Sequence, residues 1–289
     1  MIRLRLPLLL ATLLFGIMPM GVGLAQQQPV PAPAGGPPGP VNRFPTRFIV
    51  ADAPEQFDQV LMVIDFPPGS WTPAHMPGGN VYNTVVDGAV SIRPMGSSSA
   101  STYEAGATFV ANAGEYVEVG NGGDVGARMI STTILPKDAT LTTYADDTRD
   151  LSADNAGGYR MTNLLVQSPT PTIVGQGSIS VERPSRVFEL VQMLVDFEPG
   201  MWTATHMHGG YDLSMVATGA LTLERVGEVQ PLELGQAFVN APGVFHRVGN
   251  ESGGFAQAAA TFMLPTGATL TTVQPAAVPV VTQPSQSTP

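Results

Sequence analysis

The sequence predicts an all-β fold built from two homologous units. Three observations support this: short runs rich in Val, Ile, Thr and aromatic residues, turn signals between those runs, and an internal duplication. Beyond an apolar N-terminal segment, no long stretch shows the apolar period of an amphipathic helix. Only 12% of the 289 residues are charged, while Gly and Pro are abundant, which favours strands and turns.

Residues 1–25 are typical of a secretory signal peptide. Arg3 and Arg5 precede an apolar run, and the run ends in the small residues Gly23 and Ala25, as before a cleavage site. The alternative is an uncleaved membrane anchor, because the run approaches the ~20 residues that a transmembrane helix needs. We therefore expect an exported protein, periplasmic or secreted, with no membrane contact after cleavage of the signal.

The internal duplication lies between two Pro-rich tails. FDQVLMVIDFPPGSW (57–71) matches FELVQMLVDFEPGMW (188–202) at an offset of 131 positions. GATFVANAGEYVEVGN (106–121) matches GQAFVNAPGVFHRVGN (235–250) at an offset of 129. The extra two residues of the first copy fall in the Ser-rich stretch 96–101, which we expect to be a surface hairpin.

Each copy contains several short strands bounded by turn residues. In the first copy we expect strands at 60–66, 82–86, 89–93 and 127–135. In the second we expect them at 191–197, 213–217, 220–225, 237–239 and 255–264. Asp87-Gly88 is a hairpin signal, and Thr218-Gly219 is its counterpart.

The expected organisation follows from these segments. It comprises a signal peptide (1–25), a Pro/Gly-rich disordered linker (26–45), a first β unit (46–145), an inter-domain segment (146–178), a second β unit (179–273) and a disordered tail (274–289). The chain has no cysteine, so both units must be held by core packing without disulfides.

Charge excludes one class of partner. The formal net charge is −10, and the basic residues are scattered along the chain. Nucleic-acid binding normally needs clustered Lys and Arg, so no nucleic-acid partner is expected.

Three of the four histidines stand where a metal site would place them. His206 and His208 are two residues apart, so on a strand they project from the same face, and Asp212 shares that parity. His246 follows the turn 241–243 near the start of a later strand. Imidazoles and a carboxylate from separate strands would suit Fe, Mn, Ni, Cu or Zn.

These residues resemble the motifs of the cupin superfamily, and the duplication resembles that of a bicupin. The first motif is matched by Gly200, His206, His208, Asp212 and Gly219, with Asp212 where the family usually has Glu. The second motif is matched by Gly235, Gly243, His246 and Asn250, with its usual proline displaced to Pro242. The resemblance covers residues 57–272 and implies two tandem cupin barrels, each a jelly roll or double-stranded β-helix.

The resemblance also implies roles for the site residues. His206, His208 and His246 would hold a divalent transition metal, with Asp212 as a fourth ligand or as a general base toward substrate. Two alternatives for Asp212 stay open: it orients a ligand histidine by accepting its hydrogen bond, or it caps the turn after the preceding glycines. For the three histidines, the alternative is a structural polar cluster.

The first copy has lost most of this set. His75 is equivalent to His206, but Pro77, Val81 and Val117 stand where the second copy has His208, Asp212 and His246. We therefore expect the first barrel to serve packing or to hold an apolar ligand. His75 would be a satisfied residue near the barrel mouth or a single polar contact to that ligand.

Three aromatic residues carry further expectations. The chain's two tryptophans, Trp71 and Trp202, occupy equivalent positions, which predicts a packing role common to both copies. Phe245, beside His246, is expected to line a pocket.

The leading functional hypothesis is an exported, metal-dependent enzyme of the non-haem dioxygenase-like class acting on a small organic molecule. Related cupin chemistries, including other oxidoreductases and isomerases, use the same ligands. The alternative is a non-catalytic exported cupin that binds a small molecule or a metal. Paired barrels often associate further, so a homo-oligomer is compatible with the sequence.

Overall fold

The computed structural model describes residues 39–145 and 169–275, and within those ranges all regular secondary structure is β. In that part of the chain, no helix is long and apolar enough to cross a membrane. Several expected segments lie wholly or mostly outside the described residues: the signal peptide (1–25), the linker up to residue 38, the segment 146–168 and the tail from residue 276.

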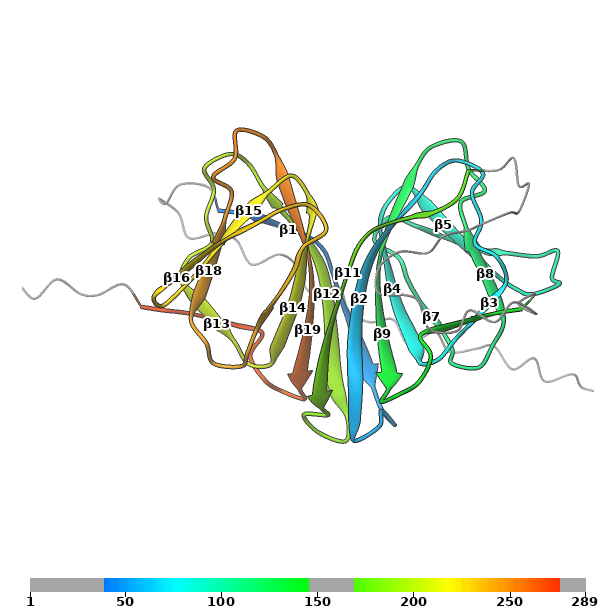
Figure 1. Cartoon of the computed structure of the whole chain (residues 1–289), viewed down its shortest axis with the longest axis horizontal. Helices are drawn as coiled ribbons and strands as arrows, with labels where there is room; N and C mark the ends of the chain where they lie inside the picture. Colours follow the sequence, from blue (N-terminus) through cyan, green and yellow to red (C-terminus); the bar gives the residue numbers. More distant parts are fainter. Residues whose placement is uncertain (1–38, 146–168, 276–289) are drawn as a thin grey trace, which may run out of the picture. The chain divides into compact units, whose positions relative to one another are not determined.

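The first repeat contributes ten strands (Figure 1). They are β1 (Val41–Val50), β2 (Gln56–Phe66), β3 (His75–Pro77), β4 (Asn80–Asp87), β5 (Ala89–Pro94), β6 (Ser101–Glu104), β7 (Thr108–Ala111), β8 (Val117–Gly120), β9 (Ala127–Pro136) and β10 (Thr142–Tyr144). The Ser-rich insertion connects β5 and β6, which pair as an antiparallel hairpin, as predicted.

The second repeat contributes the ten equivalent strands. They are β11 (Thr172–Glu182), β12 (Phe188–Phe197), β13 (His206–His208), β14 (Tyr211–Thr218), β15 (Leu221–Arg225), β16 (Glu228–Leu232), β17 (Ala237–Asn240), β18 (His246–Gly249), β19 (Ala256–Pro265) and β20 (Thr271–Val273). The all-β prediction is confirmed, and every expected strand is present with slightly different bounds.

Each barrel is made of two five-stranded antiparallel sheets. In the first barrel the strand orders are β11-β2-β9-β4-β7 and β10-β3-β8-β5-β6. In the second barrel they are β1-β12-β19-β14-β17 and β16-β15-β18-β13-β20. The sheets alternate sequence-distant strands in the same way in both repeats, as expected of duplicated double-stranded β-helix barrels.

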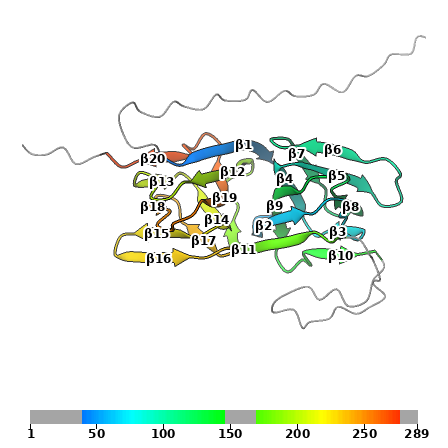
Figure 2. The ribbon, with the colours of Figure 1, turned by 90° about the horizontal axis from the view of Figure 1, so that it is seen from above.

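The first strand of each repeat belongs to the other repeat's barrel. β1 pairs along its length with β12, from Val41 opposite Asp196 to Val50 opposite Phe188. β11 pairs in the same way with β2 of the first barrel. Figure 2 shows β1 lying beside the strands of the second repeat and β11 beside β2. The two barrels are therefore joined by a reciprocal exchange of strands.

This exchange corrects the expected segment boundaries. Residues 41–45, expected to be linker, and 172–178, expected to be an inter-domain segment, are strand residues. Proline lacks the N–H that a sheet needs, so Pro45 is unusual within a strand. In the structure β1 is an edge strand, and its register shifts between Arg43 and Thr46, which accommodates the proline.

The two barrels pack against each other around an apolar core. Phe57 stacks on Phe188, with ring centroids 5.9 Å apart and planes 6° apart. Thr132 and Thr261 share a hydrogen bond of 2.9 Å. Both pairs join equivalent positions of the two repeats, so the interface has the self-complementary character of a two-fold contact. The expectation that the first barrel packs against its twin is met.

Two polar side chains tie the repeats together within this interface. Gln192 is fully buried, accepts a hydrogen bond from Thr84 Oγ1 (2.6 Å) and donates to Thr132 Oγ1 (2.7 Å). Arg128 forms a double contact with Asp65 in its own repeat and donates to Thr218 Oγ1 (2.9 Å) in the other. Because these donors and acceptors are paired, their burial costs little, and their directionality fixes how the two sheets face each other.

The two tryptophans have the predicted packing role. Trp71 lies against Gly120 and Trp202 against Gly249, and a Cβ added to Gly249 would come within 2.0 Å of the Trp202 ring. In each repeat an arginine covers the indole, with Arg247 Cζ 4.4 Å from the Trp202 ring centroid. The tryptophans therefore belong to the framework that the barrels share.

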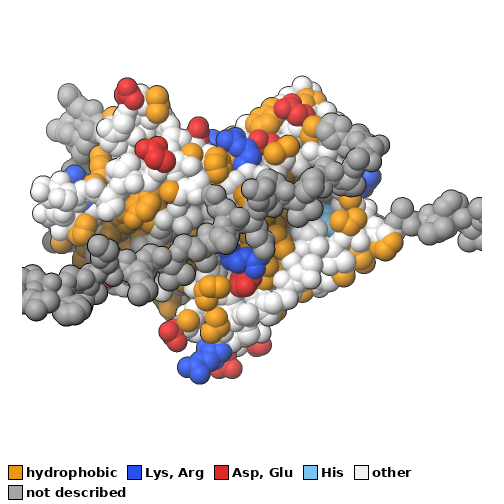
Figure 3. Space-filling view, turned by 180° about the vertical axis from the view of Figure 1, so that it is seen from behind, with side chains coloured by type: hydrophobic (Ala, Val, Ile, Leu, Met, Phe, Trp, Pro, Cys, Tyr) orange, Lys and Arg blue, Asp and Glu red, His pale blue; other side chains and the backbone are white. Residues whose placement is uncertain are grey.

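Charged side chains of both signs are spread over the surface (Figure 3). On the face shown in Figure 3, Lys and Arg side chains are scattered and Asp and Glu lie among them. No basic patch of the kind that binds nucleic acid is visible on that face.

The stacked phenylalanines at the centre of the interface provide a test of this arrangement. Phe57 and Phe188 are 1% and 0% exposed. Replacing either with alanine removes buried apolar surface and leaves a cavity, so we expect Phe57→Ala to lower the free energy of unfolding by about 3–5 kcal/mol. Chemical denaturation would measure it. Phe255→Ala is the control, since Phe255 is 41% exposed, and it should cost far less. Equal losses would contradict the packing described.

Candidate metal centre

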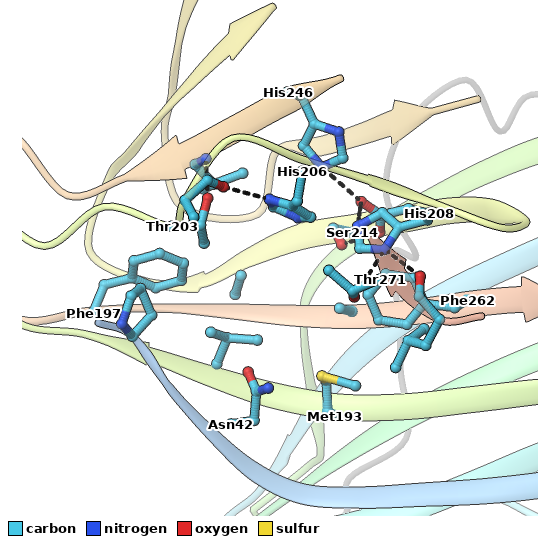
Figure 4. A pocket seen from close by; sticks show the side chains of 18 of the residues that line it. Asn42, Met193, Phe197, Thr203, His206, His208, Ser214, His246, Phe262 and Thr271 are labelled. Atoms are coloured by element: carbon cyan, nitrogen blue, oxygen red, sulfur yellow. Dashed lines mark hydrogen bonds and ion pairs between the residues drawn. The ribbon is translucent and has the colours of Figure 1, made fainter. Parts of the chain in front are cut away.

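The structure brings the three predicted histidines together (Figure 4). His206 and His208 are the two ends of β13, and His246 is the first residue of β18. β13 and β18 pair antiparallel, with His206 directly opposite His246. The potential ligand atoms of the three imidazoles all lie within 4.8 Å of one another, close enough for all three to share one ion.

Glycines allow β13 and β14 to lie close to the neighbouring chain. A Cβ added to Gly210 would come within 1.9 Å of the Met263 carbonyl oxygen, and one added to Gly209 within 2.5 Å of the Thr269 carbonyl oxygen. Only glycine fits such close backbone contacts. The close fit lets the chain pass from His208 in one sheet to Asp212 in the other within four residues.

A tight turn sets the position of His246. Gly243 has a φ of +74°, a left-handed conformation that favours glycine. Its N–H donates to the His208 carbonyl oxygen (3.0 Å), which ties the turn to the strand that carries the other two histidines. This backbone hydrogen bond therefore fixes the position of His246 relative to the strand that carries His206 and His208.

Backbone carbonyl oxygens orient all three imidazoles. The Nδ1 atoms of His206, His208 and His246 lie 2.7, 2.8 and 3.1 Å from the carbonyl oxygens of Ala204, Leu270 and Val244, respectively. A carbonyl only accepts, so each Nδ1 carries the proton and donates it. Each Nε2 is then left with a lone pair, which is the form that coordinates metals.

Burial keeps these imidazoles neutral. His206, His208 and His246 are 9%, 5% and 2% exposed. Desolvation lowers the pKa of each below its ordinary value, outweighing the carbonyl hydrogen bonds and the Asp212 charge, which act in the opposite direction. Neutral imidazoles are the protonation state that a metal requires.

Asp212 lies beside the triad, as its strand parity predicted. Its Oδ2 is 3.8 Å from His208 Nε2 and 3.9 Å from His246 Nε2, and the residue is 3% exposed. It does not cap a turn: it is the second residue of β14, and its oxygens accept hydrogen bonds from Ser214 and Asn240. Neither of these hydrogen-bond partners was predicted from the sequence, although Ser214 is two residues from Asp212 on the same strand and so faces the same side. Asn240 comes from β17 and required the sheet register.

A cavity of about 280 Å³ opens beside the triad inside the second barrel. Its lining is mainly apolar, and it includes Met193, Phe197, Phe238 and Phe262 (Figure 4). Phe245 is not among the lining residues, so that expectation is wrong. Phe245 lies in the connection between the turn 241–243 and β18, and not on the strand that carries His246.

The first repeat helps to form this cavity. Pro40, directly before β1, and Asn42, within β1, are among the residues that line it. They were expected to belong to a disordered linker, and only the exchange of β1 places them here. The candidate site of one barrel is therefore built from both repeats.

No protein-family model matches the chain, and no curated protein sequence matches it. Solved structures resemble it at low identity. AerE from Microcystis aeruginosa shares 15% identity at a TM-score of 0.43, over 77% of this chain and 98% of that one. Oxalate decarboxylase from Lactobacillus farciminis, in a formate complex, shares 10% at a TM-score of 0.46, over 75% and 79%. The 7S globulin of Momordica charantia shares 12% at 0.46, over 71% and 73%.

The fold is that of a bicupin. The chain contains two duplicated antiparallel barrels, and the residues of both sequence motifs meet inside the second one. The predicted family resemblance is thus confirmed at the level of the fold.

The first barrel retains only one of the imidazoles. His75 lies opposite Val117, as His206 lies opposite His246, so the predicted equivalence is confirmed. His75 Nδ1 lies 3.0 Å from the Pro73 carbonyl oxygen, the counterpart of the His206 contact. Val117 belongs to the apolar core of the first barrel. Among the described residues, the second-barrel triad is the one cluster of His, Cys, Asp or Glu suited to a metal.

The paired repeats supply a matched test of metal binding. We expect the purified protein to bind one Co²⁺ per chain at neutral pH, because three neutral imidazoles are already in place. His206→Ala should abolish stoichiometric binding, since it removes one of the three ligands. His75→Ala, the same change at the equivalent position, should leave it intact. Titration with elemental analysis measures both, and equal behaviour of the two variants would contradict the assignment.

The lowered pKa values predict how this binding depends on pH. A free histidine begins to lose metal to protons near its ordinary pKa of about 6.5. Since burial lowers the pKa of all three ligands, protons compete only at lower pH. The Co²⁺ dissociation constant should stay level from pH 8 to about 6.5 and rise below that. A marked rise of the dissociation constant already between pH 8 and 7 would contradict the lowered pKa of the three imidazoles.

Proposed function

We propose that this bicupin is an exported, metal-dependent enzyme of the non-haem dioxygenase-like class that acts on a small organic molecule. The observation that carries the proposal is the convergence of three buried, neutral imidazoles and one carboxylate at the wall of a cavity. A purely structural cluster of histidines would not need a cavity next to it.

The donor set fits a divalent transition metal. Imidazole nitrogens with a carboxylate suit Fe, Mn, Ni, Cu or Zn, and the Nδ1 hydrogen bonds leave the three Nε2 atoms available. When bound, such an ion would supply Lewis-acid chemistry toward a substrate oxygen and, in the case of iron, reactivity toward dioxygen. The residues that would hold it are His206, His208 and His246, with Asp212 beside them.

The lining of the cavity supports a small and largely apolar substrate. Phenylalanine, methionine, valine and alanine side chains dominate it, and no Lys or Arg is among the lining residues. A substrate with several carboxylates would find no counter-charge there. The preferred molecule would bring an oxygen-bearing end to the triad and an apolar body to the rest of the cavity. Asp212 is the one carboxylate among the lining residues, so it would serve as the fourth metal ligand or, if it stays unbound, as a base for a proton on that oxygen.

Export rests on the sequence of residues 1–25, with two arginines, an apolar run and a small-residue end. Detection of the mature N-terminus near Gln26 in the periplasm or medium of an expressing bacterium would support it. Recovery of the full-length chain in the membrane fraction would favour the uncleaved anchor.

One observation favours a second function, non-catalytic binding. Apart from the three histidines and Asp212, the lining offers no acid or base, since its other polar side chains are those of Asn42, Thr203, Ser214 and Thr271. Such a cavity would also suit a protein that only holds a small molecule or a metal.

Oxygen consumption distinguishes the two functions. The Fe²⁺-loaded protein should consume dioxygen in the presence of some member of a panel of diketones, flavonoids and catechols, as an oxygen electrode would record. His208→Ala should abolish the uptake, because it removes a ligand, whereas His75→Ala should retain it. A compound that raises the melting temperature without oxygen uptake would indicate the binding function instead.

A further inference from the structure

Asp212 is held from behind by two buried side chains. Ser214 Oγ donates to Asp212 Oδ1 (2.5 Å), and Asn240 Nδ2 donates to Asp212 Oδ2 (2.8 Å). Ser214 and Asn240 are 3% and 1% exposed. Both carboxylate oxygens are therefore engaged, and the carboxylate cannot rotate without breaking a buried hydrogen bond.

Arg225 fixes the orientation of the Asn240 amide. Its Nε donates to Asn240 Oδ1 (3.1 Å), and its Nη2 donates to the Val239 carbonyl oxygen (2.6 Å). A guanidinium group only donates, so the atom facing it must be the amide oxygen. The amide NH₂ group must then face the carboxylate. The result is a directed chain of donors from Arg225 through Asn240 to Asp212.

The first repeat lacks this series of hydrogen bonds, and it also lacks most of the candidate metal ligands. The positions equivalent to Asp212, Asn240 and Arg225 in the first repeat are Val81, Ala111 and Pro94. Pro94 lies opposite Val117 just as Arg225 lies opposite His246. The barrel framework therefore does not require these side chains, since the first barrel has the same strand order without them.

We propose that Arg225, Asn240 and Ser214 are positioning residues of the metal centre. They hold the carboxylate so that Oδ2 faces His208 and His246, at 3.8 and 3.9 Å from their Nε2 atoms, while Oδ1 is retained by Ser214. A divalent transition metal would then meet one oxygen of Asp212. The inference rests on the proposed metal site and adds the residues that control its carboxylate.

Co²⁺ binding tests this role. Asn240→Ala introduces the residue that the first repeat has at this position, and it should weaken Co²⁺ binding by about 10–100-fold, as loss of a partner behind a ligand commonly does. The visible absorption spectrum of the bound Co²⁺ should also change, because the carboxylate is released. Arg225→Met should act in the same direction. Ser214→Ala tests the same carboxylate if Asn240→Ala does not fold.

A matched arginine provides the control. Arg93 pairs with Glu118 and covers Trp71 in the first barrel, so Arg93→Met removes a similar arginine far from the triad. It should leave the Co²⁺ affinity and spectrum unchanged. The inference is overturned if Asn240→Ala and Arg225→Met bind Co²⁺ as the unmodified protein does. It is also overturned if the affinity falls with an unchanged spectrum and a lowered melting temperature of the metal-free protein, which would mean a structural role.

The same experiment separates this inference from the proposed function. If the unmodified protein binds no Co²⁺, both the metal centre and its positioning residues are wrong. If it binds one Co²⁺ per chain and the variants match it, the metal centre stands and only the positioning role falls.

Discussion

Two strands cross between the repeats, and neither barrel is complete without the strand that it receives. β1 forms an edge of the sheet that also contains β12, β19 and β14 of the second repeat. The same crossing carries Pro40 and Asn42 to the cavity beside the triad. The first repeat is therefore required by the second even though its own ligands are lost, because it supplies both a strand and part of the cavity wall.

The two barrels differ in how they meet the cost of burying polar groups. Three imidazoles and a carboxylate inside a barrel are unfavourable unless each has a partner. In the second barrel, backbone carbonyl oxygens accept hydrogen bonds from the Nδ1 atoms of the three imidazoles. Ser214 and Asn240 donate hydrogen bonds to the carboxylate of Asp212. In the first barrel, Val117 belongs to an apolar core instead. At this position the first barrel avoids the cost by burying an apolar side chain.

The sequence was sufficient to predict the fold and the triad for physical reasons. His206 and His208 are two residues apart on a strand, so their common direction is a local property, and the resemblance to the second cupin motif identified His246. The partners of Asp212 were less accessible. Asn240 lies 28 residues from Asp212 along the chain and meets it only through the pairing of β14 with β17, and Arg225 on β15 contacts Asn240.

The exchanged strands escaped prediction for a similar reason. Pro45 and the glycines of β11 are unfavourable in an isolated strand, so local propensity gives no signal for these two strands. In the structure their positions are set by partners more than a hundred residues away. Gly175 and Gly177 allow β11 to approach Gly235 and Ala237, where a Cβ would come within 2.5 and 2.3 Å of neighbouring atoms. Phe245 was misplaced because nearness to His246 along the sequence does not bring its side chain to the cavity wall.

The tryptophan sites show what the duplication preserved and what it did not. In the first barrel the arginine is Arg93 on β5, paired with Glu118 on β8. In the second barrel the charges are exchanged: the glutamate is Glu224 on β15 and the arginine is Arg247 on β18. Each pair lies directly across neighbouring strands, so either order brings a guanidinium group over the indole.

Each tryptophan site therefore needs an arginine paired with a glutamate, but either of the two strands can carry the arginine. The metal centre has no such freedom, because each Nε2 must come from one particular position to converge on a common point. This contrast separates the two kinds of difference between the repeats. An exchange of charges retains a shared contact, whereas Val117, at the position of His246, leaves the first barrel without one of the imidazoles that converge in the second.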